Sequence, residues 1–172
     1  MYEKFFSLNG RSREYFEKER LELFGNDASR VLGVLLRGTD MIGAVGHNAQ
    51  PKPQKVLETV KELISNGNLA TETYANVILF RNELGDDRVL VNKRVYYDQE
   101  KFDKGMTIND ISFDRENDKY LRGMEYLSSV MLLSECGGLI GGFCGGSVAA
   151  FYINNGEYKY NKLFDLGMNR RE

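Results

Sequence analysis

An uncharged stretch of 18 residues, Cys136–Ile153, limits what this 172-residue chain can fold into. Six of the ten residues from 137 to 146 are glycine, and glycine makes up about 10% of the chain against a usual ~7%. The stretch is near the minimum length of a membrane helix, and its glycines recur at GxxxG spacing. Paired glycines, however, lower helix propensity. We therefore predict a strand at Gly138–Gly142, a tight turn, and a helix over Ser147–Asn154, with no transmembrane segment.

The same alternation of strand and helix recurs along the chain. Val31–Leu36 is a continuous apolar run bounded by turn residues, which is typical of a buried strand in a parallel sheet. Lys55–Ile64 has apolar residues at helical spacing and follows Pro53 directly. The other predicted strands are Leu69–Thr71, Arg88–Val91 and Lys162–Leu166, and a long loop is predicted over Asn92–Lys119. The other predicted helices are a surface helix over Arg13–Phe24, one from a cap at Thr73 to Leu84, and one over Tyr120–Cys136. The last of these has an apolar stripe of Leu127, Met131 and Leu132.

This alternation predicts an α/β fold. Right-handed βαβ units give an open, mostly parallel sheet with helices on both faces, which is a Rossmann-like three-layer sandwich. A chain of this length is one domain or a little more.

Composition excludes several classes of protein. A net charge of −2 without a block of Lys or Arg argues against a nucleic-acid binder. Cys136 and Cys144 form no disulfide framework, and a single histidine completes no zinc pattern with them. The first residues lack the apolar core of a signal peptide. We expect the cysteines to be reduced and the protein to lie in the cytoplasm, either free or at the inner face of the membrane.

Three segments are predicted at the carboxyl ends of strands, where open α/β sheets bind ligands. Arg37, directly after a strand, can present a planar fork to a phosphate, or it can pair with Asp40 within the turn. Glu72 falls in the first turn of a helix, where it either serves a ligand or only opposes the helix dipole. The turn Gly141–Ser147 exposes backbone N–H groups for an anion, or it serves close packing alone. It matches neither GxGxxG nor a Walker A loop.

These segments follow one another in the order found in a known family. The motifs LLRGTD (Leu35–Asp40) with GHNAQP (Gly46–Pro51), LATETYANVILFRNELGD (Leu69–Asp86) and YLRGMEYLSSVMLLSECGGLIGGFCGGSVAAFYINNG (Tyr120–Gly156) cover most of the chain. The chain resembles the nucleotide-sugar-binding half of GT-B fucosyltransferases. That family includes core α-1,6-fucosyltransferases, nodulation fucosyltransferases and bacterial relatives from capsule and lipopolysaccharide clusters.

The resemblance implies a function and assigns residues to it. GDP-fucose or a related nucleotide sugar would be the donor, and inverting transfer would pass the sugar to a glycan acceptor in cell-surface polysaccharide biosynthesis. No metal or other cofactor is implied. Arg37 and Asp40 would be catalytic, with Arg37 holding the β-phosphate. The implied substrate-binding residues are Gly38, Thr39, His47, Thr71, Glu72, Cys144, Gly145, Gly146 and Ser147. The base is open among His47, Asp40 and Glu72.

The sequence departs from the family pattern at several points. Eukaryotic members carry His-x-Arg-Arg, where Leu35 and Gly38 stand here, and the strand ahead of Leu69 looks shortened. We expect residues 1–30 to be an N-terminal helical segment left from an interdomain region, and 31–172 to be the nucleotide-sugar-binding domain. A separate acceptor-binding domain or subunit would complete an enzyme. The alternatives are a truncated, non-catalytic GDP-sugar-binding remnant, one half of a split transferase, and an unrelated nucleotide-binding α/β protein.

Overall fold

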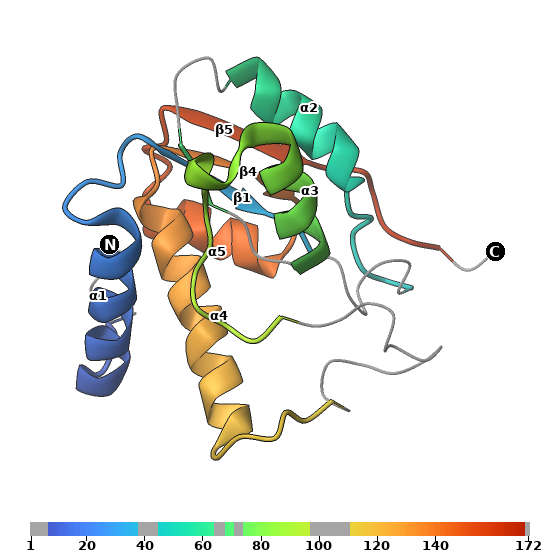
Figure 1. Cartoon of the computed structure of the whole chain (residues 1–172). Coiled ribbons are helices and arrows are strands. Elements are labelled where there is room, and N and C mark those ends of the chain that lie inside the picture. Colours follow the sequence, from blue (N-terminus) through green and yellow to red (C-terminus); the bar gives the residue numbers. More distant parts are fainter. Residues whose placement is uncertain (1–6, 38–44, 64–67, 71–73, 97–110, 171–172) are drawn as a thin grey trace.

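A central parallel sheet organises the computed structural model, which describes residues 7–37, 45–63, 68–70, 74–96 and 111–170. Five strands run in the order β3-β2-β1-β4-β5, and every neighbouring pair is parallel (Figure 1). The strands are β1 (Val31–Leu35), β2 (Asn68–Ala70), β3 (Val89–Leu90), β4 (Gly138–Gly142) and β5 (Tyr160–Phe164). The helices are α1 (Gly10–Phe24), α2 (Pro53–Leu63), α3 (Tyr74–Leu84), α4 (Asp118–Glu135) and α5 (Gly145–Ile153), with a 3₁₀ turn, η3, at Asp86–Arg88. The mixed α/β class and the parallel sheet are confirmed.

Helices cover both faces of the sheet, because side chains alternate along β1. Val34 and Leu36 belong to a core with residues of α2 and α3, while Leu35 joins a second core with residues of α4 and α5. This alternation is the period-2 geometry of a strand. α2 and α3 lie together over one side of the sheet in Figure 1. Apolar cores therefore lie on both faces of β1.

Element boundaries differ from the predictions in specific ways. Pro53 is the first residue of α2 instead of preceding it, as suits a residue without an N–H. α5 begins at Gly145, two residues early, so the last two glycines of the cluster are helical. β5 ends at Phe164, earlier than predicted. β2 is short, with three residues, as expected. The predicted cap at Thr73 lies outside the described residues.

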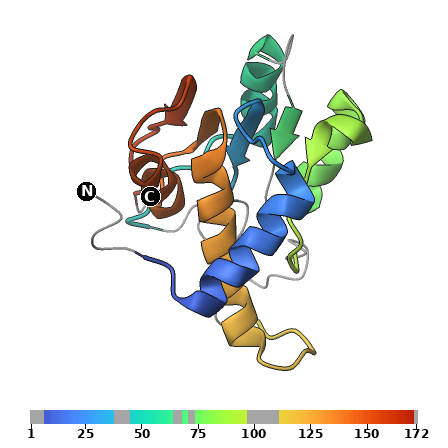
Figure 2. The same ribbon diagram turned by 90° about the vertical axis from the view of Figure 1, so that its left-hand side faces the viewer.

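The predicted apolar stripe of α4 is only partly right. Leu132 is buried, but Leu127 and Met131 are half-buried. α4 is enclosed by the sheet, by α5 and by α1, which crosses it in Figure 2, so its buried surface is wider than one stripe. Polar residues share this surface, among them Ser128, whose hydroxyl donates to Glu19 Oε2 of α1 at 2.6 Å.

Glu19 makes the α1–α4 contact dependent on pH. The residue is 8% exposed, and burial raises the pKa of its carboxyl above the model-peptide value of 4.5. Because the pKa of Glu19 is higher in the folded protein than in the unfolded chain, the protonated carboxyl stabilises the fold. This stabilisation is complete below the unfolded pKa and is lost as pH rises through the folded pKa. We expect Glu19→Gln to become more stable relative to the wild type as pH rises from 5 to 8.

Urea denaturation of both proteins across this pH range measures the difference in unfolding free energy. Glu14→Gln, at an exposed position of the same helix, is the control. A Glu19→Gln difference that is constant with pH, or that has the opposite slope, would contradict the assignment.

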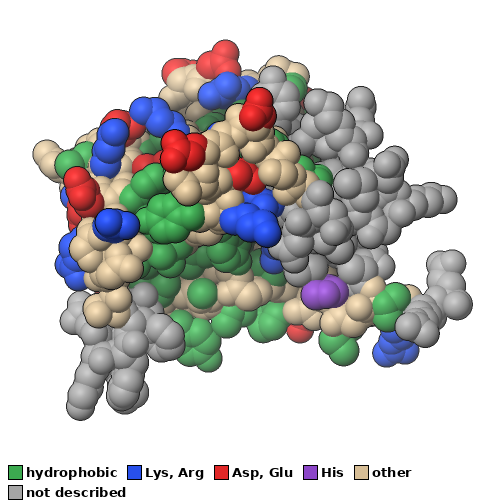
Figure 3. Space-filling model, turned by 90° about the horizontal axis from the view of Figure 1, so that it is seen from below, with side chains coloured by type: hydrophobic (Ala, Val, Ile, Leu, Met, Phe, Trp, Pro, Cys, Tyr) green, Lys and Arg blue, Asp and Glu red, His purple; other side chains and the backbone are tan. Residues whose placement is uncertain are grey.

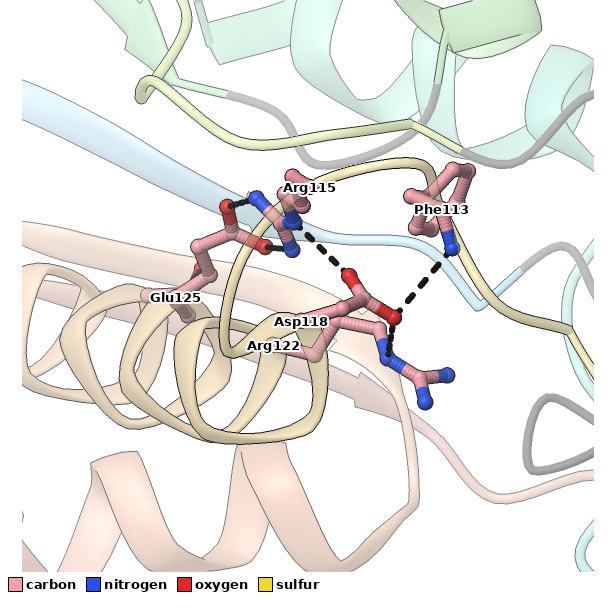
Figure 4. Close-up of polar contacts among 6 residues, drawn as sticks. Phe113, Arg115, Asp118, Arg122 and Glu125 are labelled. Carbon is pink, nitrogen blue, oxygen red and sulfur yellow. Dashed lines mark hydrogen bonds and ion pairs between the residues drawn. The ribbon is translucent and has the colours of Figure 1, made fainter.

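A cluster of largely buried ion pairs holds residues 113–115, which precede α4, against the first turns of that helix (Figure 4). Arg115 binds both carboxylate oxygens of Glu125 at 2.6 and 3.1 Å and donates from Nε to Asp118 at 2.7 Å. Asp118 also accepts from the N–H of Phe113 and pairs with Arg122 Nε at 3.1 Å. Burial alone would raise the pKa of Asp118, but these hydrogen bonds and cations outweigh it and hold that pKa below its usual value. The cluster is at the start of α4, and the end of α4 leads into the start of β4. The cluster therefore lies toward the carboxyl ends of the strands.

No helix within the described ranges combines the length and apolar character needed to cross a membrane.

Candidate functional site

The candidate site is a pocket at the carboxyl ends of β1 and β4. These strands are neighbours at the point where the strand order reverses, since the chain proceeds outward from β1 to β3 and then returns beside β1. Open parallel sheets bind ligands in the crevice at such a point. The pocket holds about 190 Å³ and is lined by Arg37, Gly46, His47, Asn48, Gln50, Phe143, Cys144 and Gly145.

Arg37 provides the positive charge of the pocket. It lies two residues beyond the end of β1 and is half-buried. Within the described ranges, no hydrogen bond or ion pair engages its guanidinium. The alternative pairing with Asp40 concerns a residue outside those ranges. A guanidinium held here by a strand end can offer a bidentate fork to a phosphate or carboxylate.

The N-terminus of α5 forms the opposite wall. The Cys144 N–H donates to Ser147 Oγ at 3.0 Å, and the Cys144 side chain accepts in return from the N–H of Ser147. This capping box satisfies two backbone donors. In the described part of the chain, the N–H groups of Gly145 and Gly146 have no acceptor. Free N–H groups and the helix dipole together attract an anion.

Ser147 supports the turn from beneath. Its side chain is 0% exposed, and its hydroxyl donates toward the carbonyl oxygens of Gly142 and Cys144 at 2.7 and 2.9 Å. The hydroxyl is thus occupied within the protein. Gly146 is also buried, with a Cβ position 2.9 Å from the Tyr126 hydroxyl oxygen. Both residues shape the turn from behind the pocket wall.

Close packing explains most of the glycine cluster. A Cβ at Gly137 or Gly141 would lie 1.9 or 2.5 Å from a backbone carbonyl oxygen, and one at Gly142 would lie 2.1 Å from Gln50 Oε1. A Cβ at Gly138 would lie 2.7 Å from Leu32 Cδ1. Only Gly145 among the six has open space at its Cβ position, and it alone of the six lines the pocket. Close packing therefore explains the other five glycines, and Gly145 is the one placed to contact an anion.

The third wall is the loop that returns from β1. Asn48 Nδ2 donates to the carbonyl of Phe143 at 3.0 Å, and Gln50 Nε2 donates to the carbonyl of Asn48 at 3.0 Å. The Asn48 amide ties the loop to the β4–α5 turn, and the Gln50 amide braces the loop itself. His47 is exposed and lines the pocket. Figure 3 shows the single histidine of the chain (purple) at the surface of this face.

The structure brings together four of the predicted site residues, Arg37, His47, Cys144 and Gly145. Gly146 and Ser147 adjoin them from behind. Five other predicted residues lie outside the described part of the chain, namely Gly38, Thr39, Asp40, Thr71 and Glu72. Of the three candidate bases, His47 is the one that the structure places at the pocket.

Four pocket residues were not among the predicted site residues: Gly46, Asn48, Gln50 and Phe143. The two amides stand in the same GHNAQP segment as His47, so a run of polar side chains between two turn-forming residues was the available signal. Nothing in the spacing indicated that this loop would fold back on the β4–α5 turn.

The chemistry of the pocket is that of an anion site. The guanidinium of Arg37, the free N–H group of Gly145 and the side-chain amides of Asn48 and Gln50 line it, and no carboxylate is among the described residues that do so. Metal-ligating side chains do not gather in threes or more anywhere in the described ranges. Comparison with protein-family models, with curated proteins and with solved structures found no match to this chain.

Proposed function

We propose that this chain is the donor-binding domain of a fucosyltransferase-like glycosyltransferase and binds the diphosphate of a GDP-sugar, GDP-fucose by preference. The observation that carries the proposal is that Arg37 and Gly145, the first residue of α5 with its free N–H group, line the same pocket. The sheet order supports the Rossmann-like interpretation, because β3-β2-β1-β4-β5 is the order of doubly wound nucleotide-binding sheets.

The size of the pocket favours a diphosphate over a whole nucleotide sugar. Sites for drug-sized ligands enclose roughly 300–1,000 Å³, whereas this pocket holds about 190 Å³. The diphosphate is the part of the donor whose charge changes most in the reaction. We therefore assign the pocket to the diphosphate and leave the base and the sugar to the rest of the crevice.

In the proposed reaction an acceptor hydroxyl attacks the anomeric carbon from the face opposite the diphosphate. The bond between the anomeric carbon and the phosphate oxygen breaks, GDP departs with the electron pair, and a base takes the hydroxyl proton. Negative charge grows on the leaving oxygen, which Arg37 and the N–H group of Gly145 would stabilise. His47 is the described residue of the pocket able to accept the proton.

A second candidate is GDP-sugar binding without turnover. The three-residue strand β2 favours it, since so short a strand gives that side of the sheet few ladder hydrogen bonds with β1. Measuring GDP released from GDP-fucose in the presence of a panel of glycan acceptors separates the two: sustained release supports the enzyme, and binding without release supports the binding protein.

Calorimetric titration with GDP, inorganic pyrophosphate and guanosine tests the proposal itself. Diphosphate recognition predicts that GDP and pyrophosphate bind while guanosine does not. Absence of binding by both phosphorylated ligands, or guanosine binding as tightly as GDP, would overturn it.

Gly145→Pro tests the part played by the helix N-terminus. Proline is tolerated at the first helical position, and Cys144 already has the extended backbone (φ −151°, ψ 168°) that a residue before proline needs. The substitution removes one free N–H and no intrahelical bond. We expect pyrophosphate binding to weaken by about 1.5 kcal/mol, the low end for a hydrogen bond to a charged group.

Gly145→Ala is the matched control, since it keeps the N–H and its Cβ has open space. Calorimetry should find Ala closer to the wild type than Pro. Equal affinities for the Pro and Ala variants would show that this N–H does not contact the ligand.

A further inference from the structure

The loop wall of the pocket is hydrogen-bonded to a segment from the far end of the chain. The N–H of Gly46 donates to the carbonyl of Asn169 at 3.1 Å, and the N–H of Asn169 donates to the carbonyl of His47 at 2.8 Å. The N–H of Ala49 donates to the carbonyl of Gly167 at 2.8 Å. Together with an antiparallel bridge between Asn48 and Met168, these bonds form a small ladder beside the pocket.

This ladder has almost no buried apolar surface. Met168 is 64% exposed, and Gly46, His47 and Gly167 are also exposed. A two-stranded ladder without burial is marginal in water, and elements with few buried contacts open at low free-energy cost. Each strand of the ladder therefore depends on the other for its position.

The ladder also joins the opposite wall of the pocket. β5 delivers the segment 167–169, and the carbonyl of its last residue, Phe164, accepts from the N–H of Phe143 at 3.1 Å. The Phe143 carbonyl in turn accepts from Asn48 Nδ2. Gly167 has φ +74°, so the chain turns there in a conformation that favours glycine. The loop, the β4–α5 turn and the segment after β5 are thus linked in series around the pocket.

We infer that Gly167, Met168 and Asn169 form a strap that positions His47 and the loop wall, so that closing the strap and binding a diphosphate in the pocket favour each other. The inference rests on the proposed function for the nature of the ligand. Reciprocity follows from linkage: a ligand that binds the closed form must stabilise that form. Residues of the strap act through His47 and Asn48 and are positioning residues.

Asn169→Pro tests the strap, because it removes the N–H that binds the His47 carbonyl while keeping the carbonyl of residue 169. His47 is the sole histidine of the chain, so its ring resonance can be followed by NMR without ambiguity. In the variant we expect this resonance to move toward that of an unstructured peptide and the Gly46 and Ala49 amides to exchange faster. The dissociation constant for pyrophosphate should rise about 3- to 10-fold.

Asn169→Ala loses the same side chain but keeps the N–H, so it is the matched control, and its dissociation constant should stay clearly below that of the Pro variant. Gly167→Val should disrupt the same strap, because position 167 has a positive φ that valine disfavours. It should reproduce the changes in exchange and affinity seen with Asn169→Pro. The thermal midpoint should hardly change, because the strap is outside both cores.

Unchanged His47 resonance and unchanged amide exchange in both strap variants would overturn the inference, as would equal effects of Pro and Ala at position 169. If the wild type does not bind pyrophosphate, the proposed function is wrong, and so is the coupling between the strap and that ligand. The exchange comparison in the free protein would still decide whether the strap positions the wall.

Discussion

Replacing Arg37 with alanine is expected to weaken the binding of GDP and pyrophosphate by about 1.5–3 kcal/mol, or roughly 10- to 150-fold. The guanidinium is the one permanently cationic side chain among the described residues that line the pocket. It lies two residues beyond the end of β1, a central strand of the sheet. A charge-assisted, forked hydrogen bond from this side chain to the diphosphate would be lost with its removal.

Arg37→Lys keeps the charge but loses the fork, so its affinity should fall between those of the wild type and Arg37→Ala. Calorimetry gives the affinities, and thermal denaturation checks the fold, which should be retained because the side chain is half-buried and outside both cores. Affinity that is the same in all three proteins would remove Arg37 from the site.

Gly137→Ala should destabilise the fold by about 3 kcal/mol or more. A Cβ at this position would lie 1.9 Å from the carbonyl oxygen of Ser29 and 2.7 Å from its carbonyl carbon. Relief by rotation of a side chain is impossible, because the obstructing atoms are backbone. The N–H of Gly137 also donates to the carbonyls of Ala28 and Val31 at 3.2 and 3.0 Å. Moving residue 137 away would break the contact that sets β4 beside β1.

Gly123→Ala is the matched control, since Gly123 is exposed in the middle of α4 and its Cβ position has no atom within 4 Å. Replacing a glycine by alanine inside a helix should raise stability by about 0.5–1 kcal/mol. Urea denaturation measures both variants. Similar unfolding free energies for Gly137→Ala and the wild type would show that the β1–β4 contact is looser than described.

The α/β class and the order of the elements were predictable because they depend on local properties. The apolar run Val31–Leu36 and the helical spacing in Lys55–Ile64 each determine an element without help from distant residues. β4 was found with its full bounds, Gly138–Gly142, since the glycine pairs exclude a continuous helix. Where the predictions erred, as at the start of α5, they missed a capping box that depends on the Cys144 and Ser147 side chains.

The parts that escaped prediction depend on residues far apart in the chain. The breadth of the buried surface of α4 comes from its contact with α1, where Ser128 meets Glu19 across 109 positions of sequence. Likewise Glu125 is 5% exposed because Arg115 binds it bidentately. A sequence pattern cannot indicate such burial, since a charged residue is ordinarily expected at the surface.

The candidate site was predictable to the same limited extent. Arg37 and Gly145 follow strands directly, so their place at one edge of a parallel sheet follows from topology. Asn48 and Gln50 enter the pocket through a loop that is tied to the β4–α5 turn and to the segment after β5. The roles of the six glycines also needed coordinates, because only neighbouring atoms distinguish a glycine required for packing from one open to a ligand.

Titration of ¹⁵N-labelled protein with GDP, followed by amide NMR, shows residue by residue whether the diphosphate binds in this pocket. If the pocket binds the diphosphate, the largest shifts appear at the amides of Gly145 and Gly146 and at the Arg37 Nε–H, and all three saturate with one dissociation constant. Shifts that are absent at these three groups, or that concentrate on another part of the chain, would contradict the account.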